Sequence, residues 1–172
     1  MQHHSDGQPQ KNPSRLRAAL NGLRGGVAVA LFAAMALSGA WITWRQYQVP
    51  RGTVTIGEDI VVRVEVAATT TTRERGLSGH APLKRGTGMW FIFPVAERYT
   101  FWMKDMRFPL DMIWVRDGVI VDITADVPPP QPGQTQLPIY SPVEPADRVL
   151  EVSAGFAREH GLRLGMPVHE AP

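Results

Sequence analysis

The sequence predicts a mainly β protein: a compact antiparallel β-sandwich or barrel with one or two short helices, preceded by one N-terminal transmembrane helix. Short segments in which apolar and polar residues alternate recur through most of the chain, as in strands with one buried face. Sixteen Gly and 15 Pro among the 172 residues separate these segments at close spacing, which is typical of all-β domains. No parallel strand–helix–strand unit is predicted.

The transmembrane helix is predicted from residues 24–45. Gly25–Trp44 is a run of twenty residues without a charge, and Arg24 and Arg45 flank it. A helix of that length spans roughly 30 Å, the thickness of a bilayer core. Residues 1–23 are polar and basic, so we expect a disordered cytoplasmic tail there and an extracytoplasmic domain beyond the membrane.

A cleavable signal peptide is the alternative for the same segment. The small residues of Ser38-Gly39-Ala40 suit a signal peptidase. The length of the apolar run, with Trp41 and Trp44 at its end, favours a retained anchor in the inner membrane. Either arrangement exports the following domain to the periplasm or cell surface, so we expect no nicotinamide or nucleotide cofactor and no cofactor of another kind. The membrane is the first expected partner.

Charge and cysteine content exclude several function classes. The net charge of +2 divides unevenly: residues 1–45 hold five Lys/Arg and one acidic residue, whereas residues 46–172 hold thirteen and fifteen. The exported part is therefore slightly acidic and has no basic stripe, so nucleic acid is not an expected partner. The absence of cysteine excludes disulfides, thiolate zinc sites and a Cys nucleophile.

Residues 46–52 are predicted to be a linker and residues 53–172 the exported β domain. A capping-box spacing from Thr71 to Glu74 predicts one short helix that ends near Gly79, and a second is expected over residues 154–161. Asp117-Gly118 predicts a tight hairpin turn. Residues 127–145, with seven prolines, are expected to form a surface excursion outside the sheet. The predicted strands are 53–56, 60–67, 89–93 (stopped by Pro94), 99–104, 110–115, 119–125, 148–153 and 166–169.

The most distinctive stretch is Thr100–Val115, T-F-W-M-K-D-M-R-F-P-L-D-M-I-W-V. Its two strands are predicted to form a central hairpin, interrupted at Pro109. Strand alternation places Trp102 on the same side as Lys104, whereas Phe101 and Met103 point to the other side. Trp102 is therefore the candidate for an exposed stacking platform that contacts a sugar ring or a partner.

A set of motifs occurs in a fixed order: R-G-L at 75–77, G-M-W-F at 88–91, F-W-M-K at 101–104, P-L-D at 109–111, V-L-E-V at 149–152 with A-G at 154–155, and G-L at 161–162 with Gly165. Together these motifs resemble the domain-of-unknown-function family 192 over about residues 61–168. The resemblance implies a compact, β-sandwich-like exported domain and implies no activity. The family usually has Asn-Thr after W-M-K, where this chain has Asp105-Met106, and a Met and an Arg soon after R-G-L, where it has Ser78-Gly79-His80.

The candidate ligand-binding residues are mainly charged. Asp111 and Glu151 interrupt otherwise apolar strands, and a charge there is costly to bury unless it is paired. They could form structural ion pairs with nearby cations, face solvent from an edge strand, or line a polar pocket. The preferred hypothesis is a non-catalytic domain that binds a small ligand, a glycan or an envelope protein through Arg75, Trp102, Lys104, Asp105, Asp111 and Glu151.

Two other functions remain open at this level. An envelope hydrolase could use Asp111 or Glu151 as acid or base, with Lys104 or Arg75 stabilising negative charge. A periplasmic copper-binding module could use the thioethers of Met103 and Met106 with His80 or His160, although Met residues also fill irregular cores.

Overall fold

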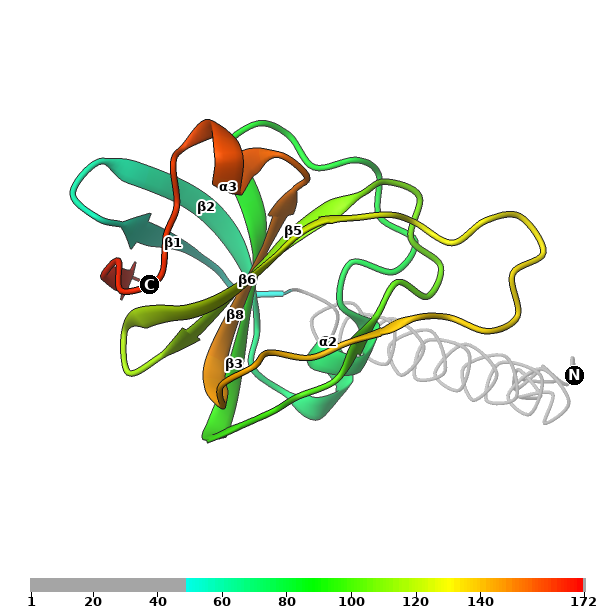
Figure 1. The fold of residues 1–172 in the computed structure, drawn as a ribbon, viewed down its shortest axis with the longest axis horizontal. Coiled ribbons are helices and arrows are strands. Elements are labelled where there is room, and N and C mark those ends of the chain that lie inside the picture. The colour runs from blue at the N-terminus through cyan, green and yellow to red at the C-terminus, as the bar shows by residue number, and fades with distance from the viewer. Residues whose placement is uncertain (1–48, 172) are drawn as a thin grey trace, which may run out of the picture. The chain divides into compact units, whose positions relative to one another are not determined.

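The computed structural model describes residues 49–171 (Figure 1). The predicted tail and transmembrane helix lie outside these residues. Between Val49 and Ala171, no helix is both long and apolar enough to span a membrane.

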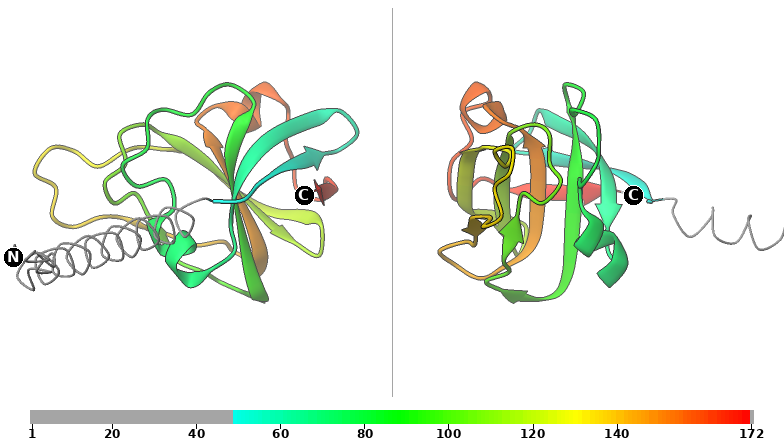
Figure 2. Two further views of the ribbon diagram at one scale, coloured as in Figure 1. Left: turned by 180° about the vertical axis from the view of Figure 1, so that it is seen from behind. Right: turned by 90° about the vertical axis from the view of Figure 1, so that its right-hand side faces the viewer.

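A seven-stranded curled sheet forms a half-barrel and confirms the mainly β prediction (Figures 1 and 2). A bridge between Val119 and Pro167 links strands from the two edges of the sheet at one end. The strand order is β6-β5-β8-β3-β2-β1-β9, with β1 Arg51–Ile56, β2 Ile60–Ala67, β3 Thr87–Glu97, β5 Leu110–Arg116, β6 Val119–Val127, β8 Ala146–Ser153 and β9 Val168–Ala171.

The expectation of a wholly antiparallel sheet is wrong at one pair of strands. β2 and β3 run parallel, with Val66 opposite Trp90, and the chain between them contains helix α2 (Thr70–Arg75). This is a strand–helix–strand crossover that the sequence did not reveal, because a six-residue helix without a buried residue has no apolar periodicity. Its N-cap is Thr69, which forms a capping box with Thr72, so the helix begins earlier than predicted.

The three strands β3, β8 and β5 are buried on both faces. In β8, Leu150 and Val152 face the inside of the half-barrel, where they pack with Val54, Val62 and other residues of a first core. Val149 on the opposite face belongs to a second core on the outside of the sheet, together with Phe91, Met112 and Trp114 of the neighbouring strands. Continuous apolar runs such as Met112–Val115 reflect this double burial.

Short segments cover the second core. They are α2 with the turn that follows it, the stretch from Tyr99 to Phe108, and a two-stranded ribbon of β4 (Phe101–Trp102) and β7 (Ile139–Tyr140). The predicted hairpin between residues 99–104 and 110–115 is therefore wrong, since β4 pairs with β7 of the proline-rich excursion and not with β5.

Three further elements can be set against those expected from the sequence. The hairpin turn at Asp117 and Gly118 is confirmed, with φ of 51° and 74°, the positive values of a type I′ turn. Pro94 does not end β3, which continues to Glu97 along an irregular pairing with β8. The second short helix, α3, covers Phe156–Glu159.

Candidate functional site

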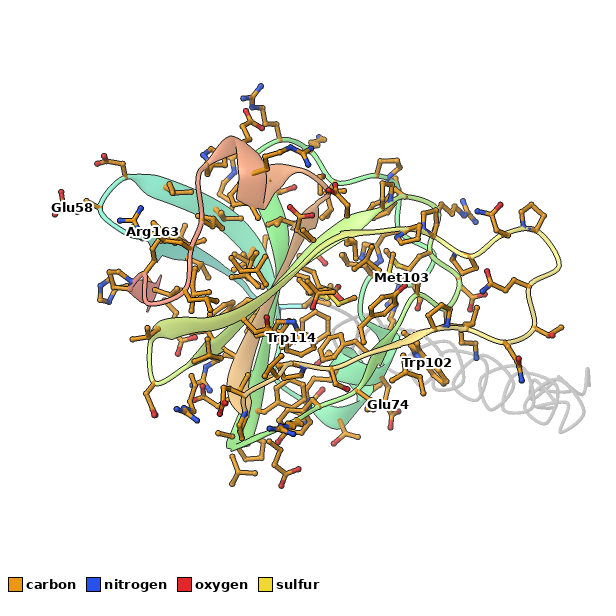
Figure 3. The ribbon with its side chains drawn as sticks, in the orientation of Figure 1. Glu58, Glu74, Trp102, Met103, Trp114 and Arg163 are labelled. Carbon is orange, nitrogen blue, oxygen red and sulfur yellow. The ribbon has the colours of Figure 1, made fainter. Side chains whose placement is uncertain are left out.

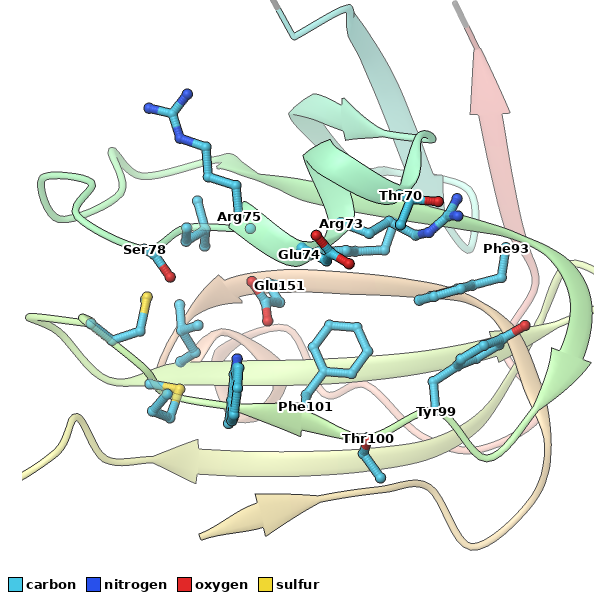
Figure 4. Close-up of a pocket in the computed structure, with 17 residues that line it drawn as sticks. Thr70, Arg73, Glu74, Arg75, Ser78, Phe93, Tyr99, Thr100, Phe101 and Glu151 are labelled. Atoms are coloured by element: carbon cyan, nitrogen blue, oxygen red, sulfur yellow. The ribbon is translucent and has the colours of Figure 1, made fainter. Parts of the chain in front are cut away.

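A cavity of about 380 Å³ lies over the outer face of β3, β8 and β5 (Figure 4). One wall is α2 with the turn at residues 76–78, and the other is the segment 99–106. Phe91 and Phe93 of β3, Leu110 of β5 and Glu151 of β8 form the floor. The full lining is Thr70, Arg73, Glu74, Arg75, Gly76, Leu77, Ser78, Phe91, Phe93, Tyr99, Thr100, Phe101, Trp102, Met103, Met106, Leu110 and Glu151.

The two walls are joined at one end by hydrogen bonds. Ser78 Oγ donates to the carbonyl of Lys104 at 2.8 Å, and the Gly79 amide donates to the carbonyl of Asp105 at 3.1 Å. Asp105 has a φ of 58°, a left-handed conformation that Asn and Asp tolerate better than most residues. Asp105 thus contacts the opposite wall through its backbone, and its side chain is exposed and outside the cavity lining.

Gly76 shapes the bend between α2 and the floor. Its φ of 48° suits glycine, and a Cβ at this position would lie 3.4 Å from Phe91 Cζ. The chain can therefore turn closely over the aromatic floor and bring Leu77 and Ser78 into the cavity wall. This is the structural role of the R-G-L motif.

Aromatic rings form much of the cavity surface. Phe93 stacks on Tyr99 with ring centroids 3.7 Å apart, and Phe101 meets Phe91 edge-to-face at 5.0 Å. The Arg73 guanidinium lies 5.2 Å from the centroid of Phe93 and donates to the carbonyls of Ala68 and Ile92. These contacts pack the rings of the wall at residues 99–106 against the rings of the floor, with one cation already placed on a ring face.

Glu151 is the buried polar group of the cavity. Its residue is only 5% exposed, and its side chain points into the cavity among apolar side chains (Figure 4). Within residues 49–171, no hydrogen bond or ion pair engages its carboxyl group. Burial raises the pKa of Glu151 to about 8, because desolvation penalises the ionised form. At neutral pH this side chain is therefore mainly a neutral carboxylic acid.

Asp111 lies on the opposite face of the sheet and is fully buried. Its Oδ1 accepts hydrogen bonds from the amides of Asp126 at 2.8 Å and Gly155 at 3.2 Å, and Oδ2 accepts from Ala157 at 2.8 Å. The carboxylate thereby links β5 to the end of β6 and to the start of α3. Because the register pairs Asp111 with Val152 and not with Glu151, the two carboxyl groups do not share a site. A hydrolase that used both carboxyl groups in one active site would need them on the same face of the sheet, and here they lie on opposite faces.

The other predicted ligand-binding residues are exposed. Trp102 is 59% exposed and lines the cavity, whereas Lys104 lies outside the lining with its Nζ 5.7 Å from the Trp102 ring centroid. Arg75 lines the cavity, but its guanidinium is directed away from Glu151 (Figure 4). Figure 3 shows Trp102, Met103 and Glu74 on the side of the sheet that carries α2. No ion pair joins Arg75 or Lys104 to either buried carboxyl group within the described chain.

The structure brings together two of the three proposed copper ligands. Met103 and Met106 are buried and both line the cavity. His80 and His160 are both absent from the lining. The ring of His80 lies near Glu65, with Nε2 3.6 Å from a carboxylate oxygen, and near the carbonyl of Ser78. Among residues 49–171 there is also no group of three His, Cys, Asp or Glu side chains that could hold a metal ion.

Sequence reasoning placed Arg75, Trp102 and Glu151 in the site but missed most of the lining. Phe93, Tyr99 and Arg73 come from segments that carry no recognisable motif. The R-G-L and F-W-M-K motifs were a usable signal, since they supply facing parts of the two walls.

The family profile of DUF192, described as an uncharacterized ACR, matches residues 52–169. The chain belongs to the DUF192 family. This confirms the resemblance stated from the motifs, and the matched region contains the whole cavity. No curated protein matches the chain.

Two solved structures are similar to this DUF192 domain. A proposed transcription regulator from Sinorhizobium meliloti 1021 has 26% identity and a TM-score of 0.63, covering 72% of this chain and 95% of that one. A protein of unknown function from Novosphingobium aromaticivorans DSM 12444 has 29% identity and a TM-score of 0.61, covering 68% and 83%. They support the fold and assign no activity to this chain.

Replacing Asp111 with Asn should destabilise the domain. The variant exchanges a carboxylate that accepts three amide hydrogen bonds for a group with one oxygen and an N–H donor facing other donors. We expect a loss of about 2–4 kcal/mol in the free energy of unfolding, measured by chemical denaturation. Asp117→Asn, an exposed turn position, is the matched control and should change it by less than about 0.5 kcal/mol. Equal stabilities of the two variants would contradict the structural role.

Glu151→Gln should change the pH dependence of stability. The pKa of Glu151 is raised to about 8 in the folded state, above its usual value of 4.5, so the folded state binds the proton more tightly than the unfolded chain. The stabilising contribution is complete below the unfolded pKa and is lost as pH rises toward 8. Between pH 5 and 8 the unfolding free energy of wild type should fall relative to that of the variant by about 1.4 kcal/mol per pH unit. Parallel profiles for the two proteins would show that Glu151 is ionised in the fold.

Proposed function

We propose that this DUF192 protein is a membrane-tethered, extracytoplasmic domain that binds a small ligand in the cavity between α2 and the segment 99–106. The exposed ring of Trp102 forms the rim of the site, and Glu151 provides the polar group at its floor. The domain acts by binding, without a catalytic step of its own.

The buried carboxyl group of Glu151 in an aromatic cavity is the observation that carries this proposal. Ligand sites are typically concave, about 300–1,000 Å³ in volume and mostly apolar, with few polar groups that fix orientation. The cavity of about 380 Å³ fits this description. A core without a ligand role would more simply hold an apolar side chain at this position, since a buried carboxyl group without a partner is costly.

The size of the cavity favours a small ligand over the other two partners considered. A glycan or an envelope protein would contact mainly the rim, where Trp102 and Ile139 are paired across β4 and β7 and are both well exposed. Such a partner would leave the carboxyl group of Glu151 without a role, whereas a small ligand inside the cavity uses both features.

The uncharged run at residues 25–44 and the excess of basic residues before it support the location outside the cytoplasm. The slightly acidic balance of residues 46–172 argues against carrying over a role in transcription from the solved neighbour, since nucleic-acid binding requires a basic surface.

Trp102→Ala should weaken ligand binding at the cavity. We suggest a thermal-shift screen of cell-envelope small molecules against the full chain in lipid nanodiscs, followed by titration calorimetry of the hits. A ligand that stacks on the rim should bind Trp102→Ala about tenfold more weakly, which corresponds to a loss of about 1.4 kcal/mol.

Val61→Ala is the matched control for this experiment. Val61 is 57% exposed and lies on β2 outside the cavity lining, so its truncation should leave the affinity unchanged. Equal affinities of wild type and Trp102→Ala for every hit would remove the rim from the proposed site.

A further inference from the structure

We infer that the ligand of this cavity is an amine: it carries an ammonium group on an aromatic or other apolar body, and the nitrogen pairs with the carboxylate of Glu151. This inference rests on the proposed binding function and specifies the chemical class of the ligand. It follows from the placement of one acidic group among apolar and aromatic walls.

Glu151 lacks a counter-ion that a ligand cation would supply. The residue is 5% exposed, its carboxyl group points into the cavity, and no described residue hydrogen-bonds or ion-pairs with it. A buried carboxylate is stable only when it is paired and hydrogen-bonded. An ammonium ion provides both, since it carries a positive charge and several N–H donors.

The walls are suited to the remainder of such a ligand. Phe91, Phe93, Tyr99 and Phe101 all line the cavity, so its surface is largely aromatic. Ring faces attract cations through their quadrupole, and Arg73 on the face of Phe93 is an example within this lining. An apolar body attached to the amine would be buried against the same rings.

The other charged and titratable groups of the lining do not form an anion-binding site beside Glu151. From α2 they are Arg73, Glu74 and Arg75, and from the opposite wall Tyr99, while β3 and β5 contribute none. Arg73 is already bonded to two carbonyl groups and Arg75 is directed away from the floor, so neither is placed to receive an anion beside Glu151. The Tyr99 hydroxyl donates to the carbonyl of Val95, and burial raises its pKa above 10, so it stays neutral in the range considered.

Pairing of Glu151 with an ammonium ion should release a proton from the carboxyl group, and this release can be measured. In the empty cavity the Glu151 carboxyl group is mainly protonated at pH 7, because its pKa is about 8. Formation of the ion pair releases that proton to the buffer, while the amine keeps its own. A pKa of about 8 corresponds to release of about 0.9 proton per ligand bound at pH 7, and to affinity about eightfold higher at pH 8.5.

Titration calorimetry of the full chain in nanodiscs tests this balance with 2-phenylethylamine and its neutral analogue 2-phenylethanol as probes. Each is measured at pH 7 in two buffers of different ionisation enthalpy, and again at pH 8.5. The amine should bind at least tenfold more tightly than the alcohol, release about 0.9 proton at pH 7, and gain affinity with pH. The alcohol should release no proton.

Two variants assign the effect to one carboxyl group. Glu151→Gln should abolish proton release and lower amine affinity about tenfold or more, because the amide keeps the shape but cannot ionise. Glu74→Gln, the same change at the exposed carboxylate of the lining, should alter amine affinity by less than about twofold.

The possible failures are distinguishable. Equal affinities for amine and alcohol that Glu151→Gln leaves unchanged would overturn the amine inference while ligand binding at the cavity stands. Loss of amine binding in Glu74→Gln but not in Glu151→Gln would place the cation at the mouth and overturn it as well. Binding of neither probe would also overturn the inference, whereas the proposed function is judged separately by the Trp102→Ala comparison.

Discussion

Double burial of the strands β3, β8 and β5 is the constraint on which the rest of this structure depends. One face of these strands closes the inside of the half-barrel, and the other is equally apolar and must be covered from outside. Hydrogen bonding between the strands does not remove the side chains of Phe91, Met112 and Trp114 from water, so other segments must pack over them. The segments that look irregular in the sequence, from α2 to the proline-rich excursion, are the layer that covers them.

This covering layer explains why a cavity forms where it does. A regular second sheet would interdigitate with the outer face and fill it. Here a six-residue helix and a two-residue strand bridge the space, held together by the contacts of Ser78 and Gly79 with the chain at Lys104 and Asp105. Phe101 of the layer packs against Phe93 of the sheet. Beside this contact a cavity of about 380 Å³ remains, and Glu151 is part of its lining.

Two acidic residues in neighbouring strands show how environment separates a structural role from the ligand-binding role that we propose. Asp111 accepts three backbone amides and holds α3 and the end of β6 against β5. Glu151 precedes Val152, the residue of β8 that lies opposite Asp111, so its side chain points to the other face of the sheet. It has no such partners among the described residues and faces the cavity. A carboxyl group with its own amide donors supports the fold, whereas one that is desolvated beside an open volume is available to a ligand.

The sequence predicted what depends on local pattern. Alternation located the strands, the Asp117-Gly118 turn was recognised from its dipeptide, and an acidic residue in an apolar strand correctly marked Glu151 as unusual. The parallel pairing of β2 with β3 and the pairing of Trp102 with Ile139 could not be predicted, because both join segments separated by loops without periodicity. The side of the sheet that each carboxyl group faces follows from strand register, so Asp111 and Glu151 were grouped together from the sequence although they lie apart.

We infer that Glu151 is a neutral, desolvated acid at the floor of the cavity. A carbon-13 NMR titration of the glutamate carboxyl signals in the ligand-free full chain, with the Glu151 signal assigned by its loss in Glu151→Gln, tests this most directly. The account predicts a titration midpoint for Glu151 near pH 8. A midpoint near the ordinary glutamate value of 4.5 would show a solvated or paired carboxylate and would overturn this inference.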